Sequence, residues 1–305
     1  MSNTELARKE VGLLSWVTDA INDGISNILG GAAASMLSEL IENSNAVVSN
    51  TSAKLGMTPD SGIMNLMKNI NENVAMPIAA VMLTYIMTYE LITMITEKNH
   101  GNEVGTWVLF KWIFKTAVLV MLCKHSWEIA NAFFETGGWI ATKANTVIGS
   151  KIVNPSVSAP TENEIKEWLV ATYDVGQLLK IMLIAFIDWL ITLISGVLCQ
   201  VVIIVRLFEI AIYVSCASIP AASFGNRDWK SIGENYTKGL AGIGMQSFFI
   251  MVALGMYAVM VGSTVVISSG SNVIKGLENL ILYGIAMTIV IWNSKKIAFA
   301  IIDAH

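Results

Sequence analysis

The stretch "IVRLFEIAIYVSCASIPAASFGNRDWK", residues 204–230, is the part of the sequence that decides the fold. It begins as an apolar run that contains Arg206 and Glu209, breaks at Ile219-Pro220, and continues as a short aromatic and basic loop. A charged side chain at the centre of a lipid-facing helix costs roughly 2.5–3.5 kcal/mol. The two charges therefore predict a membrane helix whose polar side faces protein or water.

The composition of the whole chain agrees with a membrane location. Of 305 residues, 54% are hydrophobic and 14% are charged, and the mean hydropathy is +0.60. Soluble domains carry about 25% charged residues. Several apolar runs approach the length of about 20 residues that crosses a bilayer as a helix. We therefore expect an all-α polytopic membrane protein, and the net charge of −4 gives no sign of a nucleic-acid-binding domain.

Residues that could carry catalysis or bind a metal are scattered. The three cysteines lie in or beside apolar runs without metal-ligand spacing, and the three histidines are isolated. No catalytic sequence motif is present. We therefore expect this chain to be no enzyme, with no metal and no cofactor.

The chain divides into four regions. Residues 1–73 show apolar residues at helical spacing beside acidic ones, which predicts an amphipathic helical region outside the membrane that faces partner helices. Residues 74–123 hold the first two spans, and residues 124–177 form a polar loop region with a short acidic helix at 162–170. Residues 178–305 form a C-terminal transmembrane bundle with a loop at 220–238. Five spans follow, at 74–96, 106–123, 178–219, 239–264 and 277–292.

The third apolar run is twice the usual length. A helix of about 40 residues measures about 60 Å, so the run is either one long helix or a tight hairpin that would make six spans. At 100° per residue, Asp188 and Arg206 share one side of a continuous helix, and Thr192 and Ser195 lie near it. A hairpin would scatter these polar residues, so the pattern favours a single long helix.

The basic residues predict an orientation. Short connections on one side of the five-span arrangement carry most of the lysine and arginine. The positive-inside rule then places the loop 220–238 and the C-terminus in the cytoplasm, and the N-terminus and residues 124–177 outside. The six-span alternative satisfies the same rule. Either way we expect a multi-pass protein of the cell membrane.

Charged and polar residues within the spans should face protein or water and form pairs. Glu90 lies seven residues before the turn 97–104 and Lys111 seven after it, which predicts a contact between them across the first two spans. Arg206 and Glu209 either pair with each other within the helix or line a path between subunits, and both alternatives are open. Gln246 is expected to donate or accept an interhelical hydrogen bond. The set of intramembrane candidates is Glu90, Lys111, Lys115, Asp188, Arg206, Glu209 and Gln246.

Residues 206–246 carry a resemblance to a known family. A long span with arginine and glutamate ends at "IP", and the loop "FGNRDWKSIGENYTKGLAGIGMQ" leads into the next span. This order, after an amphipathic N-terminal region and a large central loop, resembles the TrbL-type inner-membrane subunit of conjugative type IV secretion systems, in its compact Gram-positive form.

The resemblance implies a membrane channel or scaffold subunit that helps a single-stranded DNA–relaxase complex cross the cell membrane. It implies partners: further copies of the chain, secretion ATPases, a bitopic assembly factor and the bilayer. In this picture Pro220 ends the long helix at the cytoplasmic surface. Other functions that we considered are a non-conducting assembly scaffold and a secondary transporter of a small solute. The loop residues available to lipid, an ATPase or DNA are Arg227, Trp229, Lys230 and Lys238.

Overall fold

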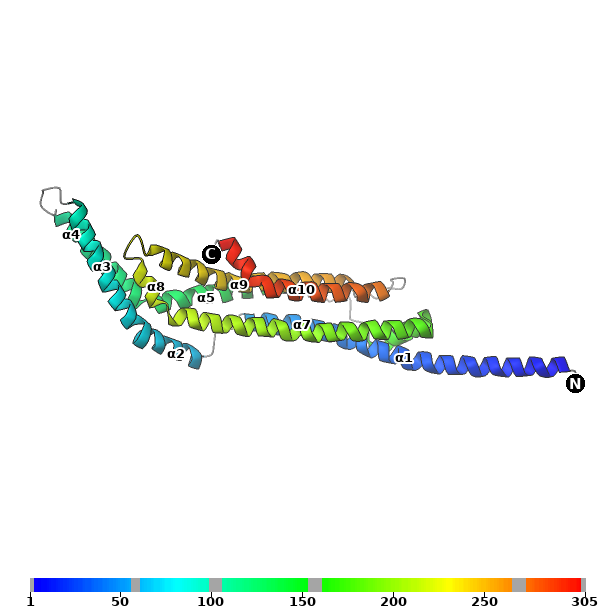
Figure 1. The fold of residues 1–305 in the computed structure, drawn as a ribbon. Helices are drawn as coiled ribbons and strands as arrows, with labels where there is room; N and C mark the ends of the chain where they lie inside the picture. The colour runs from blue at the N-terminus through cyan, green and yellow to red at the C-terminus, as the bar shows by residue number, and fades with distance from the viewer. Residues whose placement is uncertain (1–2, 56–60, 99–105, 153–160, 265–272, 303–305) are drawn as a thin grey trace. The chain divides into compact units, whose positions relative to one another are not determined.

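The computed structural model describes residues 3–55, 61–98, 106–152, 161–264 and 273–302, and within these ranges the chain is helical apart from short connections such as 173–174, 216–217 and 224–229 (Figure 1). In chain order the elements are α1 Asn3–Leu55, α2 Ser61–Ile70, the π-helical segment η1 Asn71–Ala75, α3 Met76–Lys98, α4 Thr106–Lys124, α5 Ser126–Ile152, α6 Glu162–Thr172, α7 Val175–Ser215, α8 Ser218–Ser223, α9 Lys230–Thr264 and α10 Val273–Ile302.

The helices form two compact units. Unit 1 consists of residues 1–50, 148–198 and 254–289, and unit 2 of residues 51–147, 199–253 and 290–305. The long helices α1, α5, α7, α9 and α10 contribute residues to both. Each unit has its own buried residues, and the candidate site lies in unit 2.

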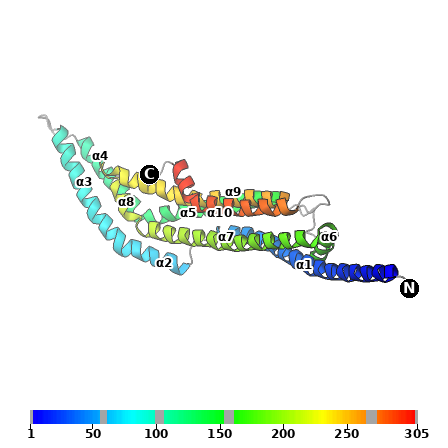
Figure 2. The same ribbon diagram turned by 45° about the vertical axis from the view of Figure 1, so that its right-hand side comes forward.

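The third apolar run is a single helix. α7 extends over 41 residues without a break (Figures 1 and 2), which confirms the prediction of one long helix and rules out the hairpin. Gly196, near the middle of α7, is a packing position: an added Cβ would lie 2.9 Å from Cγ2 of Val47 in α1. Close approach to another helix, rather than a turn, accounts for this glycine.

Six described segments are long and apolar enough to cross a membrane. Five correspond to the predicted spans. The sixth is Trp16–Leu55 of α1, the least apolar of the six, in the region that the sequence places outside the membrane. The segments are Trp16–Leu55, Gly62–Thr96, Thr106–Lys124, Val175–Ser215, Lys230–Val261 and Val273–Ile302.

In unit 1, α1 and α6 approach closely. An added Cβ on Gly30 would lie 2.4 Å from Cγ2 of Val170. The predicted acidic helix is confirmed as α6, and a capping box begins it: the Glu164 amide donates to the Thr161 hydroxyl, and the Thr161 amide donates to the Glu164 carboxylate at 2.8 Å. These hydrogen bonds lower the pKa of Glu164 below its usual value, because they stabilise the ionised carboxylate.

In unit 2, two apolar clusters hold the helices together. The first joins α3, α4 and α8 and includes Leu83, Leu119 and Ala222. The second joins α5, α7 and α9 and includes Phe134 and Val214. The second cluster holds the end of α7 through Ile210 and Val214, and the first holds the short helix α8 that follows it.

α7 ends earlier than predicted. The helix stops at Ser215, and Pro220 lies in the first turn of the separate helix α8, so the prediction that the long helix continues to residue 219 and is ended by Pro220 was wrong. Proline at position 220 has no N–H for the Cys216 carbonyl, and its ring would clash there. In the first turn of α8 the missing N–H costs nothing, since that turn has no intrahelical acceptors. The predicted loop 220–238 is correspondingly shorter, because α9 already begins at Lys230.

Candidate functional site

Arg206 is the most deeply buried charged residue of unit 2. Its side chain lies on α7 at 2% relative exposure, and its Nε donates to the Ile243 carbonyl of α9 at 3.3 Å. Its Nη1 is also buried, and no residue that the structure describes accepts a hydrogen bond from it. A buried charge carries a desolvation penalty of several kcal/mol unless it is paired. Arg206 is therefore a costly residue that packing alone does not explain.

Glu209 does not neutralise Arg206. Its carboxylate pairs with Nζ of Lys295 in α10 at 2.6 Å, across 86 residues of sequence. The intrahelical Arg206–Glu209 pair, one of the two alternatives left open by the sequence, is therefore not formed. In the sequence Lys295 is recognisable only as a basic residue near the C-terminus, because nothing there links it to Glu209.

Gln246 forms the interhelical hydrogen bond that was predicted. Its Nε2 donates to Oγ of Ser294 in α10 at 3.1 Å, and both side chains are buried. Its Oε1 is buried and accepts no hydrogen bond from the described residues. α7, α9 and α10 thus meet through polar contacts at Arg206, Glu209 and Gln246, inside helices that are otherwise apolar.

Asp188 lies in unit 1 and is described separately. It is 2% exposed, and Thr192 and Ser195, which follow it at helical spacing on α7, are 4% exposed each. Oδ2 of Asp188 has no hydrogen-bond partner among the described residues. Ser195 accepts a hydrogen bond from Thr288 of α10 at 2.8 Å. The polar side of α7 predicted from the sequence is therefore turned toward protein in this unit.

The charges of the first two spans pair differently from the prediction. Glu90 accepts a hydrogen bond from Lys115 at 2.9 Å, so the predicted Glu90–Lys111 contact is wrong by one helical turn. Lys111 instead lies 5.3 Å from the centre of the Trp107 ring. Lys111 and Lys115 lie one turn apart on the same side of α4, so the predicted side of the helix was right and the predicted depth was wrong.

Asn71 caps the end of α7, and no pattern in the sequence marks it as a functional residue. Its Nδ2 donates to the carbonyls of Val214 and Ser215 at 3.3 and 3.1 Å, and its Oδ1 accepts from the Ser218 hydroxyl at 2.9 Å. The Ser218 hydroxyl also lies 2.9 Å from that of Ser126. These contacts satisfy backbone groups that every helix end leaves without an intrahelical partner.

Three of the predicted loop residues lie at the surface. Arg227 and Lys230 are exposed, and Trp229 is 39% exposed. Lys230 pairs with Glu234 at 2.6 Å within α9. Lys238, also in α9, is half-buried. Pro220, in contrast, is buried. Exposed aromatic and basic side chains of this kind suit a membrane–water interface.

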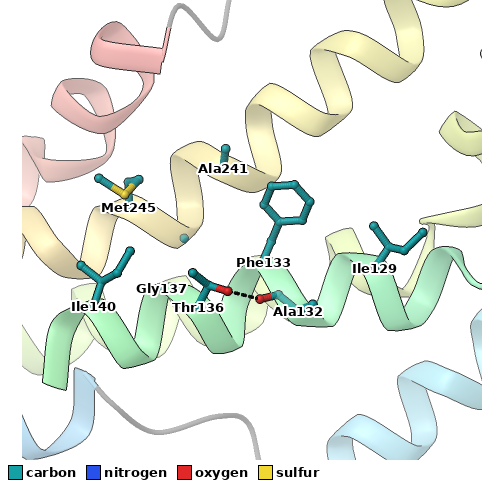
Figure 3. A pocket seen from close by; sticks show the side chains of 9 residues that line it. Ile129, Ala132, Phe133, Thr136, Gly137, Ile140, Ala241 and Met245 are labelled. Atoms are coloured by element: carbon teal, nitrogen blue, oxygen red, sulfur yellow. Dashed lines mark hydrogen bonds between the residues drawn. The ribbon is translucent and has the colours of Figure 1, made fainter. Parts of the chain in front are cut away.

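An apolar groove of about 420 Å³ lies between α5 and α9 (Figure 3). α5 contributes Ile129, Phe133 and Ile140, and α9 contributes Ala241 and Met245. The backbones of the two helices touch beside it, since an added Cβ on Gly137 would lie 2.4 Å from the Gly244 carbonyl oxygen. The groove holds no charged side chain in its lining, which makes it a packing feature rather than a site for chemistry.

Long apolar helices, intramembrane charge pairs and a helix break at proline define a multi-pass helical membrane protein. A family model described as "TrbL/VirB6 plasmid conjugal transfer like protein" matches residues 44–218. The match covers more than half of the chain and includes α7 with Arg206 and Glu209. The chain belongs to this TrbL/VirB6-like conjugal transfer family, which confirms the resemblance found in the sequence.

No curated protein and no solved structure matches the chain.

Proposed function

We propose that this chain is a channel subunit of a conjugative type IV secretion apparatus and helps a DNA–protein substrate cross the cell membrane. Family membership supports the coarser statement, that it is a membrane subunit of a conjugal transfer system. The channel role rests on the side chains of unit 2. In this role the chain is no enzyme, and associated ATPases supply the energy.

Arg206 is the observation that carries the channel role. A residue kept only for structure would be paired or replaced by an apolar one, since well-packed apolar residues in place of buried charges are often neutral or stabilising by 1–4 kcal/mol. Arg206 keeps a buried donor for which the described residues provide no acceptor, while the nearest carboxylate in sequence is engaged by Lys295. When the helices separate, a cation held in this way can interact with an anionic substrate or with a part of the protein that moves.

A non-conducting scaffold is the second candidate, and Arg206→Met separates the two. Methionine has a similar volume and no charge, so we expect the free energy of unfolding to stay the same or to rise by about 1–4 kcal/mol. A channel subunit with this substitution should assemble into the membrane complex and lose DNA transfer by at least tenfold. A scaffold with this substitution should instead lose assembly, and DNA transfer with it.

Leu207→Met is the matched control, because Leu207 is the next residue on α7 and is only partly buried. Assembly is measured by co-purification with the other secretion subunits, and transfer by mating frequency. Normal transfer with Arg206→Met would reject the channel role of this residue. Loss of assembly with Arg206→Met, but not with Leu207→Met, would favour the scaffold.

A further inference from the structure

Asp188 is a buried carboxyl group that the proposed function does not use. It lies in unit 1, on the buried side of α7, and is 2% exposed. On that side Ala185 precedes it and Thr192 follows it by one turn, and both are buried as well. Its Oδ2 finds no hydrogen-bond partner among the described residues. Burying a polar group without a partner is unfavourable, and burying an unpaired charge is far more so.

No basic side chain that the structure describes pairs with Asp188. α10 meets this part of α7 where Thr288 donates to Ser195 at 2.8 Å, and α1 meets it where Val47 packs against Gly196. The other buried titratable side chain described in unit 1 is Tyr257 of α9, which bonds to Ser44 of α1. The charged and titratable side chains of α1 and α10 at this level are not buried: Glu39, Glu42, Glu278 and Tyr283.

A metal ion does not fit this position either. A hard cation such as Ca²⁺ takes about six to eight oxygen ligands. Asp188 is the one carboxylate that the structure describes as buried in unit 1, and no cluster of three or more His, Cys, Asp or Glu among the described residues could hold a metal. The hydroxyls of Ser195 and Thr288 already bond to each other. A proton, in contrast, needs a single oxygen atom.

We propose that Asp188 is a proton-binding site, which holds its proton while α7 is packed in unit 1 and releases it to water when this packing opens. The bound proton removes the charge, so the carboxyl group can stay buried without a basic partner. After release, the carboxylate needs water around it. A ligand that binds one state of a protein favours that state, so proton binding and the closed packing of α7 stabilise each other.

The polar residues beside Asp188 indicate where water would enter. Thr192 and Ser195 continue the buried side of α7 toward its C-terminus, whereas Ile181 and Ala185 continue it toward the N-terminus. Water is therefore expected to reach Asp188 past Thr192. The inference does not depend on the channel role, because a scaffold subunit would carry the same carboxyl group.

Infrared difference spectroscopy tests the protonation directly. The spectrum of Asp188→Asn is subtracted from that of the unsubstituted full chain, both in membranes at neutral pH. We expect the carbonyl band of a protonated carboxylic acid in the difference, and its loss as the pH is raised. Glu90→Gln is the matched control: Glu90 pairs with Lys115 at 2.9 Å, so its difference spectrum should contain the bands of an ionised carboxylate.

The link between the proton and the packing needs a second measurement. Thr192→Cys is alkylated with a small water-soluble thiol reagent at neutral and at alkaline pH, and the labelled peptide identifies residue 192 among the native cysteines. We expect alkaline pH to raise this labelling at least threefold more in the chain with Asp188 than in the chain with Asp188→Asn. The comparison between the two chains removes the intrinsic pH dependence of the thiol.

Carboxylate bands in place of the acid band at neutral pH would overturn the proposal. If those bands shifted when choline was replaced by Na⁺ or K⁺, Asp188 would be a cation site instead. Failure of Asp188→Asn to fold would also count against the proposal, because an uncharged side chain of the same shape should be accepted. Equal labelling of Thr192→Cys in both chains would reject the link between proton release and opening.

Discussion

Asn71 illustrates at the residue scale how one amide joins three helix ends. It caps the last carbonyls of α7, binds the first residue of α8, and reaches Ser126 at the start of α5 through Ser218. The side chain is fully buried. It lies in the π-helical segment η1, and single π-helical turns recur at functional sites. The hydrogen bonds of Asn71 therefore hold the end of α7 and the start of α8 together.

Asn71→Ala is expected to destabilise the protein. The Val214 carbonyl keeps a hydrogen bond from the Ala217 amide, and Ser218 keeps its contact with Ser126, so the Ser215 carbonyl loses most. Leaving one buried group without a partner costs about 1–3 kcal/mol. The free energy of unfolding in detergent should fall by this amount.

Asn73→Ala is the control for this prediction. Its Nδ2 donates only to the Asn69 carbonyl, and the residue is exposed, so its loss should change the free energy of unfolding by less than about 0.5 kcal/mol. If the two variants lost equal stability, the capping role assigned to Asn71 would be wrong.

Charge pairing could be predicted from the sequence only in part. Glu90 was expected to pair across the first two spans and does so, but with Lys115. The side of α4 that carries Lys111 and Lys115 follows from their spacing, whereas the depth at which either meets Glu90 depends on how the two helices cross. For Glu209 and Lys295 neither depth nor angle was available, since 86 residues separate them.

At the scale of helices, close backbone contact between α5 and α9 shapes unit 2. Gly137 lies against Gly244, and the Ser247 hydroxyl donates to the Gly137 carbonyl at 3.0 Å. Small residues of this kind allow membrane helices to pack without a hydrophobic driving force between them. The stretch "GLAGIGMQ", residues 239–246, supplies Gly244 to this crossing.

Gly137→Ala should therefore lower stability although alanine favours helix. The new Cβ would lie 2.4 Å from a backbone oxygen that cannot rotate away, and overpacking of this kind costs typically about 1–3 kcal/mol. We expect the melting temperature in detergent to fall, and the α5–α9 groove to widen.

Gly24→Ala is the matched control on α1. An added Cβ there meets nothing within 4 Å, so the substitution should be neutral or stabilising by up to about 1 kcal/mol. A fall in melting temperature that is the same for both variants would show that the crossing tolerates a methyl group.

For the whole molecule, topology is the property that remains a prediction. Single cysteines at Ser2, Ser158, Asp228 and Ser271 report on it through a membrane-impermeant thiol reagent in intact cells. Asp228 is exposed, whereas the neighbouring Asn226 is buried and would react poorly from either side. Ser2, Ser158 and Ser271 lie outside the described residues.

We expect labelling at Ser2, Ser158 and Ser271, and at Asp228 only after permeabilisation, which corresponds to five spans and a cytoplasmic C-terminus. If Ser2, unlike Ser158 and Ser271, is labelled only after permeabilisation, then α1 also crosses the membrane through Trp16–Leu55. Labelling of Asp228 in intact cells would reverse the predicted orientation.

The sequence alone determined the helical membrane class, the five apolar spans, the single long α7 and the family. Each can be predicted from the order of residues alone. Bilayer thickness sets the length of an apolar run that crosses it, and the helical spacing of the polar residues in α7 indicates one continuous helix. Tertiary structure alone decided that α7 ends at Ser215 under the cap of Asn71, that Glu209 pairs with Lys295, and that one donor of Arg206 finds no acceptor among the described residues. These depend on which sides of distant helices meet, and helix crossing is set by packing in three dimensions rather than by spacing in sequence.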